Sequence, residues 1–167
     1  MAVSRYHVAE STERERSMAG RVVSPCVGLC STTVGDRVCR GCQRIDDEIR
    51  DWPGFEADER RRRMDELDAL RASVADRHLT VVDAEALQAQ LERHRIRFRE
   101  DQPALSRAVE LLRVGRGRIR DLSRYGLEPR EPLDAMALHE RIADELMTAA
   151  EARRLSVDAS LLSSPLR

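Results

Sequence analysis

The chain contains neither lysine nor asparagine, so arginine supplies all 29 of its basic residues. The codons of both missing amino acids are rich in adenine, which indicates a GC-rich coding sequence. Arginine is therefore the default cation in this chain, and its abundance alone is weak evidence for guanidinium chemistry. Only the placement of an arginine carries information about function.

Aromatic residues are also scarce, at 3% of the 167 residues, whereas 35% of the residues are charged. This balance excludes a large compact core, and a hydrophobic content of 41% excludes wholesale disorder. Long amphipathic helices fit such a composition. The formal net charge of −1 gives no indication of a nucleic-acid or membrane partner.

No stretch approaches 18 consecutive apolar residues, and the first 20 residues are polar and carry both signs of charge. We therefore expect a soluble, cytoplasmic protein without a membrane partner. Residues 1–20 are expected to form a flexible tail, and Met18 is an alternative translation start.

Cysteine is absent from the whole chain except for one segment, SPCVGLCSTTVGDRVCRGC at residues 24–42. The spacing is C-x3-C-x8-C-x2-C, which places two close pairs beside each other, as tetrahedral thiolate coordination requires. In a reducing compartment such a cluster favours a metal over disulfides, although two disulfides in any of three pairings stay open. We predict one metal centre with four ligands: Cys26, Cys30, Cys39 and Cys42.

Residues beside the cysteines fit such a site. Gly41 suits a tight turn whose backbone amides point at sulfur, and Gly28 is placed to do the same in the first pair. A hairpin turn is expected around Gly35-Asp36. Four thiolates carry excess negative charge, and three arginines outside the ligand set are placed to offset it: Arg37, Arg40 and Arg44. Metal binding, worth roughly 10–16 kcal/mol in zinc-finger peptides, would then stabilise the fold of this short segment.

The identity of the metal stays open between zinc and an iron–sulfur cluster. The two-pair layout is typical of zinc, and the common ferredoxin spacings are absent. The segment nevertheless resembles the short bacterial proteins of domain-of-unknown-function family 1289 over roughly residues 24–70. The matching positions are Ser24, Pro25, Cys26, Cys30, Cys39, Arg40, Gly41, Cys42, Arg44, Glu48, Ile49 and Trp52.

Members of that family are often labelled predicted iron–sulfur proteins. The resemblance implies a shared four-cysteine site and makes an iron–sulfur cluster an equal candidate beside zinc. Two departures from the family pattern are Gln43, where glycine is common, and Ile45-Asp46, where a threonine often follows the arginine. Neither departure affects a predicted ligand.

The rest of the chain predicts a mainly α fold. A short helix is expected to start at the acidic trio 46–48 and a charged one to run over residues 56–75, which completes a metal-binding module at residues 21–76. Apolar periodicity predicts three further helices at about 84–100, 103–124 and 132–154. They would form an antiparallel bundle or hairpin within a helical module at residues 80–156, followed by a tail at 157–167.

Several motifs in the second half point to no catalysis. Gly115-Arg116-Gly117 lacks the rest of a phosphate loop, and His139-Glu140 lacks the second histidine of a zinc-protease helix because position 143 is alanine. Residues 84–130 carry an excess of only four positive charges, so nucleic acid is a minor alternative partner.

We therefore predict a non-enzymatic four-cysteine metal-binding protein whose helices at 84–154 bind a protein partner or a second copy. One alternative is an iron–sulfur protein in electron transfer, redox sensing or cluster handling. A further alternative is a nucleic-acid-binding zinc ribbon that uses the three arginines of the cysteine segment.

Overall fold

The structure is a computed structural model that describes residues 22–162, with side-chain surroundings up to residue 159. The predicted flexible tail at 1–20 and residues 163–167 lie outside the described part. The elements in chain order are η1 (Ser31–Val34), α2 (Asp46–Asp51), η2 (Trp52–Gly54), α3 (Ala57–Ala75), β1 (Leu79–Val81), α4 (Ala84–Arg93), α5 (Ala104–Gly115), η3 (Leu122–Tyr125), β2 (Leu127–Pro129) and α6 (Ala135–Leu162).

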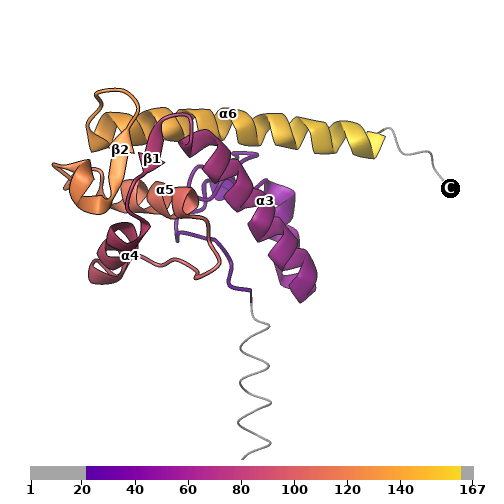
Figure 1. Ribbon diagram of the computed structural model, residues 1–167. Coiled ribbons are helices and arrows are strands. Elements are labelled where there is room, and N and C mark those ends of the chain that lie inside the picture. The colour runs from indigo at the N-terminus through magenta and orange to yellow at the C-terminus, as the bar shows by residue number, and fades with distance from the viewer. Residues whose placement is uncertain (1–21, 163–167) are drawn as a thin grey trace, which may run out of the picture.

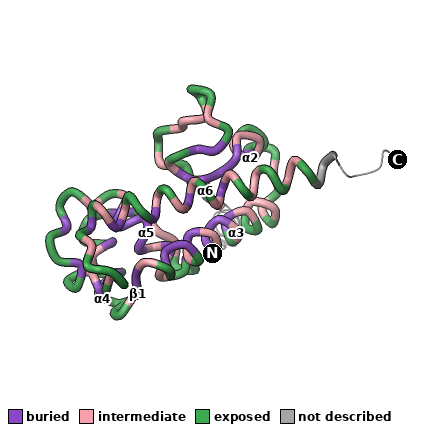
Figure 2. Tube along the Cα trace, turned by 90° about the horizontal axis from the view of Figure 1, so that it is seen from above, coloured by how far each residue is buried: buried purple, intermediate pink, exposed green. Residues whose placement is uncertain are grey.

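The described chain is mainly helical with one small sheet, so the predicted mainly α class is confirmed at that level. Helix α3 packs against α5 and α6, and α4 covers the far side of α5 (Figure 1). The buried residues gather where α3, α5 and α6 face one another (Figure 2). The main core is built mostly from aliphatic side chains, among them Val74, Leu79, Leu91, Leu111, Leu112, Leu138 and Ile142.

The segment that carries the cysteines lies against α3 and the middle of α6. A small second cluster joins them, in which Val38 and Ile45 pack on Ala150. Beyond this contact α6 runs past the other elements (Figure 1). It continues to Leu162, where a tail had been predicted from residue 157, because no proline or glycine interrupts the helix-forming sequence there.

Helix α4 begins as predicted, with the Asp83 side chain accepting from the Ala86 N–H at 2.9 Å, but it ends at Arg93 rather than near residue 100. Arg95 adopts a left-handed φ of 53°, and the Ile96 N–H donates to the Leu91 carbonyl at 2.8 Å. This is a Schellman-type end, which turns Ile96 into the core. The prediction that this helix extends to about residue 100 was wrong for that reason.

Helix α5 ends at Gly115, well short of the predicted Arg124. A methyl group at Gly115 would lie 2.9 Å from Ile119 Cδ1, so the chain turns tightly here and packs Ile119 beneath the turn. The following chain forms η3 and then β2, which pairs antiparallel with β1 in the register Leu79↔Pro129 and Val81↔Leu127. The sequence did not predict this sheet. Within residues 22–162, no helix combines the length and apolar character needed to cross a membrane.

Candidate metal centre

The second cysteine pair forms a tight turn, Cys39-Arg40-Gly41-Cys42. The Gln43 N–H donates to the Cys39 carbonyl at 2.8 Å, and the Cys39 N–H donates to the Arg44 carbonyl at 2.9 Å. Both cysteines of this pair are buried. A methyl group at Gly41 would lie 2.6 Å from Val27 Cγ2, so glycine is required because the first pair's loop packs directly on this turn.

Backbone hydrogen bonds involve the thiol of Cys39. Backbone hydrogen bonding at Cys42, Ser31 and Gly41 lowers the pKa of the Cys39 thiol, and Cys39 Sγ lies 3.9 Å from the Leu29 carbonyl oxygen. Burial alone would raise the pKa of the Cys39 thiol, but these hydrogen bonds outweigh burial, so its pKa lies below the ordinary value. Burial raises the pKa of Cys42, partly opposed by hydrogen bonds from Arg44.

Each of the four thiols has a hydrogen-bond partner two residues further along the chain. The Gly28 N–H, with Gly28 at a φ of 93°, lies 3.5 Å from Cys26 Sγ. Thr32 Oγ1 lies 3.0 Å from Cys30 Sγ, and the remaining two pairs are Gly41 with Cys39 and Arg44 with Cys42. The local turns therefore place a hydrogen-bonding group near sulfur at all four positions.

The segment of the first pair lies along the turn of the second. The Arg40 N–H donates to Ser31 Oγ at 3.0 Å, and Arg44 Nη2 donates to Ser24 Oγ at 3.2 Å. From the helical body, Arg97 Nη2 donates to the carbonyls of Ser24 and Cys26 at 3.3 and 3.0 Å. Between the pairs the chain forms the 3-10 turn η1 and a bend at Gly35, rather than the predicted hairpin.

The four cysteines are free thiols in this structure, so none of the three possible disulfide pairings is formed. Cys26 is exposed and Cys30 is partly exposed, whereas Cys39 and Cys42 are buried. Among the described residues, no group of three or more histidine, cysteine or acidic side chains is arranged to hold a metal ion. A single metal site shared by all four sulfurs therefore stays a prediction. The second pair, Cys39 and Cys42, is the more buried part of that predicted site.

The three arginines predicted beside the site have different partners. Arg44 is 4% exposed, its Nε lies 3.4 Å from Cys42 Sγ, and its guanidinium lies over the ring of Trp52. Arg37 pairs with Asp46 at 3.3 Å, and Arg40 pairs with Asp36 at 2.9 Å. Of the three, Arg44 contacts a sulfur, whereas the other two contact carboxylates.

Buried polar residues that the sequence did not single out join the cysteine turn to the helices. Gln43 has a left-handed φ of 59°, and its Oε1 accepts from Arg71 Nε at 3.1 Å. Arg71, on α3 and 3% exposed, also pairs with Glu110 of α5 at 3.0 Å. One feature of the sequence could have indicated this link: Gln43 stands where proteins of the resembling family commonly have glycine.

A second polar link starts from Glu48, in the acidic trio that opens α2. All three acids lie in the first turn of α2, as predicted. The Glu48 carboxylate is buried and accepts from the Ile45 N–H at 3.2 Å, which caps the helix. It also pairs with Arg63 of α3 at 3.1 Å and with Arg153 of α6. One carboxylate thus connects α2 to both long helices.

Comparison with known families adds one finding. Residues 24–71 match the family described as "Protein of unknown function (DUF1289)", so the resemblance predicted from the cysteine motif is confirmed over this segment. The matched segment spans the cysteine turn, α2 and most of α3, and ends at Arg71. No curated protein and no solved structure matches the chain.

Proposed function

We propose that the chain is a small non-enzymatic protein in which Cys26, Cys30, Cys39 and Cys42 bind one metal centre. The observation that carries this proposal is the buried pair Cys39 and Cys42, in which backbone hydrogen bonding lowers the pKa of Cys39 although burial alone would raise it. Metals bind the thiolate form, and amide donors stabilise the negative charge that four such ligands concentrate. A buried pair of ordinary structural cysteines needs no such donors.

Coordination by all four sulfurs requires the exposed first pair to approach the second. Zinc–sulfur bonds are about 2.3 Å long, so the ligands must converge closely. Gly28 and Gly35, both at positive φ with open space around their Cα atoms, provide flexible points on either side of Cys30. The donors to Cys39 and Cys42 are already in place, so this pair is proposed to receive the metal first.

An iron–sulfur cluster is the second candidate for the same four cysteines. Hydrogen bonds to sulfur and burial of the ligands are the factors by which a protein sets a cluster's reduction potential, and both are present at Cys39 and Cys42. Zinc would instead give a purely structural centre that stabilises the fold of the segment. The nucleic-acid alternative is weaker, because Arg44 is buried and Arg37 and Arg40 are paired with carboxylates.

Metal analysis of anaerobically purified protein, combined with an absorption spectrum, tests the proposal. One zinc per chain without colour supports a structural centre, and a brown protein absorbing near about 400 nm supports a cluster. Cys39→Ser and Cys42→Ser should each abolish stoichiometric metal, whereas Ser73→Ala on α3 should leave it unchanged. Metal below about one equivalent per site after anaerobic reconstitution, or full retention in Cys39→Ser, would overturn the proposal.

The helical module is proposed to contact a protein partner or a second copy. Exposed apolar side chains on its long helices support this: Val114 at the end of α5, and Met136 and Leu155 on α6. Light scattering over a range of protein concentrations distinguishes a second copy from a different partner. A mass that stays monomeric at high concentration excludes self-association.

A further inference from the structure

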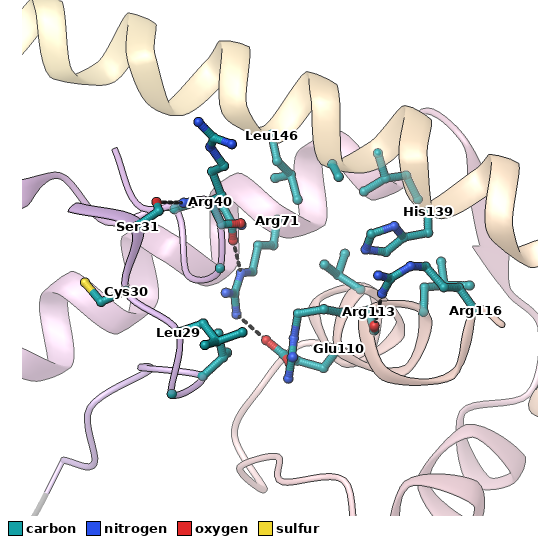
Figure 3. A pocket seen from close by; sticks show the side chains of 18 of the residues that line it. Leu29, Cys30, Ser31, Arg40, Arg71, Glu110, Arg113, Arg116, His139 and Leu146 are labelled. Atoms are coloured by element: carbon teal, nitrogen blue, oxygen red, sulfur yellow. Dashed lines mark hydrogen bonds and ion pairs between the residues drawn. The ribbon is translucent and has the colours of Figure 1, made fainter. Parts of the chain in front are cut away.

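A cavity of about 890 Å³ lies between the cysteine segment and the helices (Figure 3). One side is formed by residues 27–31, 33, 34, 40, 41 and 43, and the other by residues between 109 and 116 at the end of α5 and between 139 and 146 of α6. Its volume falls within the range of small-molecule sites, roughly 300–1,000 Å³. None of the metal ligands except Cys30 lines it.

One wall of the cavity is aliphatic. Leu112 of α5 and Ile142 and Leu146 of α6 line it, with Ala143 between them. On the opposite side stands Val27 of the cysteine segment. A ligand with an apolar body would remove this surface from water, which contributes roughly 25 cal/mol for each Å² buried.

The polar lining of the cavity carries an excess of positive charge. Four arginines line it and one carboxylate, that of Glu110. Glu110 is shared by Arg71 at 3.0 Å and Arg113 at 2.9 Å, so both of its oxygens are already used. No ion pair joins Arg116 to a carboxylate within residues 22–159; its guanidinium donates to the Arg113 carbonyl instead.

A histidine with an unsatisfied nitrogen stands at the same end. Figure 3 shows the ring of His139, from α6, beside the guanidinium of Arg116. Nδ1 of His139 is buried and has no hydrogen-bond partner among the described residues. Burial and the positive charges of Arg116 and Arg113 lower the pKa of His139. A negative ligand group would compensate the positive charges and supply a partner at this end.

We propose that this cavity binds a small organic anion with an apolar body, such as a medium-chain carboxylate. The carboxylate lies at Arg116 and His139, and the hydrocarbon lies along Leu112, Ile142 and Leu146. This site goes beyond the proposed metal centre, because the groups that bind the head and the tail come from α5 and α6. The cysteine segment supplies only the facing wall.

Isothermal titration of the full chain with octanoate tests the proposal, with 1-octanol and octylamine as matched ligands of the same chain length. Octanoate should bind one site at least about tenfold more tightly than octanol, because hydrogen bonds to charged groups discriminate by about that factor or more. Octylamine should bind more weakly than octanol, because its charge is repelled. Equal affinities for octanoate and octanol would overturn the assignment of the head-group site.

Variants locate the ligand. Arg116→Gln should weaken octanoate binding about tenfold without changing octanol binding, whereas Arg124→Gln, the same change outside the cavity, should change neither. Ala143→Phe, at a partly exposed lining position, should block both ligands by filling the cavity. Circular dichroism confirms folding of each variant. Wild-type affinity in Arg116→Gln or Ala143→Phe refutes the site.

Nuclear magnetic resonance provides an independent readout. The imidazole resonances of His139 should shift on octanoate addition, whereas those of His78 and His94, which do not line this cavity, should stay in place. A reverse pattern, or no saturable shift at millimolar octanoate, refutes the proposal. Metal content measured on the same samples separates this outcome from any failure of the metal centre.

Discussion

Replacing Gln43 with glycine sets two opposing contributions to the free energy of unfolding against each other. The φ of Gln43 is 59°, in the left-handed region. A side chain costs about 1–2 kcal/mol in that conformation, and glycine avoids this cost. The greater freedom of glycine in the unfolded chain offsets about 0.5–1 kcal/mol of the gain. Relief of strain alone therefore predicts a stabilisation of about 0.5–1 kcal/mol.

The side chain of Gln43 supplies the larger, opposite contribution. Its Oε1 accepts from Arg71 Nε at 3.1 Å, and its Nε2 donates to the Arg40 carbonyl at 3.0 Å. Because Arg71 is buried, water does not readily replace the lost acceptor. A hydrogen bond to a charged group contributes about 1.5–3 kcal/mol and a neutral one about 1 kcal/mol. The loss should therefore exceed the gain by about 2 kcal/mol.

Urea denaturation followed by the fluorescence of Trp52 measures the difference. Trp52 is the single tryptophan of the chain and is buried beneath Arg44. Gln43→Gly should lower the free energy of unfolding by about 2 kcal/mol, and Gln43→Ala by about 1 kcal/mol more, because alanine keeps the strained φ. Metal content must be equal in all samples, since a ligand of the folded state adds stability.

The same substitution in an Arg71→Met variant tests whether the Gln43–Arg71 hydrogen bond is the cause. In an Arg71→Met chain the charged partner is absent, so Gln43→Gly should change the free energy of unfolding by less than about 1 kcal/mol. Equal destabilisation in the two backgrounds would show that the Gln43–Arg71 bond contributes nothing. A stabilised Gln43→Gly in the wild-type background would show that strain dominates.

Three further predictions concern a buried ion pair, a glycine in a tight turn and a partly buried histidine. Glu48→Gln should lower the free energy of unfolding by about 2–3 kcal/mol, because it removes the buried carboxylate that pairs with arginines of both α3 and α6. Urea denaturation measures this difference. A change below about 0.5 kcal/mol contradicts the prediction. Gly126→Ala should lower the free energy of unfolding by about 3 kcal/mol in the same assay, because φ is +67° and the new methyl would lie 2.0 Å from the Asp83 carbonyl oxygen. The control is Gly54→Ala, whose methyl would face open space. It should change the free energy of unfolding by less than about 0.5 kcal/mol. Burial and two nearby arginines lower the pKa of His139, so the unfolded chain takes up that proton first as the pH falls. Stability should drop from about pH 7 to about pH 5, by more in the wild type than in His139→Gln; an equal drop refutes the assignment.

Local sequence patterns predicted the elements whose causes are local. The acidic trio lies in the first turn of α2, and the turn around Gly41 is closed by the Gln43 N–H, which donates to the Cys39 carbonyl. The start of α4 is likewise set locally, since Asp83 accepts from an N–H three residues further along the chain. The ends of α4 and α5 were predicted too late, because tertiary contacts of Ile96 and Ile119 terminate them. Apolar periodicity continues past both ends and cannot show where the backbone turns.

The two-stranded sheet escaped prediction for another reason. Each strand has three residues, too few to show an alternating pattern, and the partners Val81 and Leu127 are far apart in sequence. Charged residues show the same limit. Of the four consecutive arginines on α3, Arg61 and Arg62 are exposed and pair with acids of the same helix, whereas Arg63 pairs with the buried Glu48 and Arg60 donates to the Trp52 carbonyl. A charge at a helix surface shows its partner only once the neighbouring segment is placed.

The contacts between the cysteine segment and the helical body explain how such a small unit keeps one orientation. Its apolar contact with α6 is limited to a few side chains around Ala150, and an apolar patch of that size permits sliding, because hydrophobic contact is not directional. The hydrogen bonds that Arg71 donates to Gln43, and that Arg153 donates to Glu48, are directional and buried, so a shift of either helix leaves a charge unpaired. These links fix the second cysteine pair relative to α3, α5 and α6. Any metal centre bound at Cys39 and Cys42 would therefore be held at a fixed position relative to the cavity, because the same segment forms one wall of that cavity.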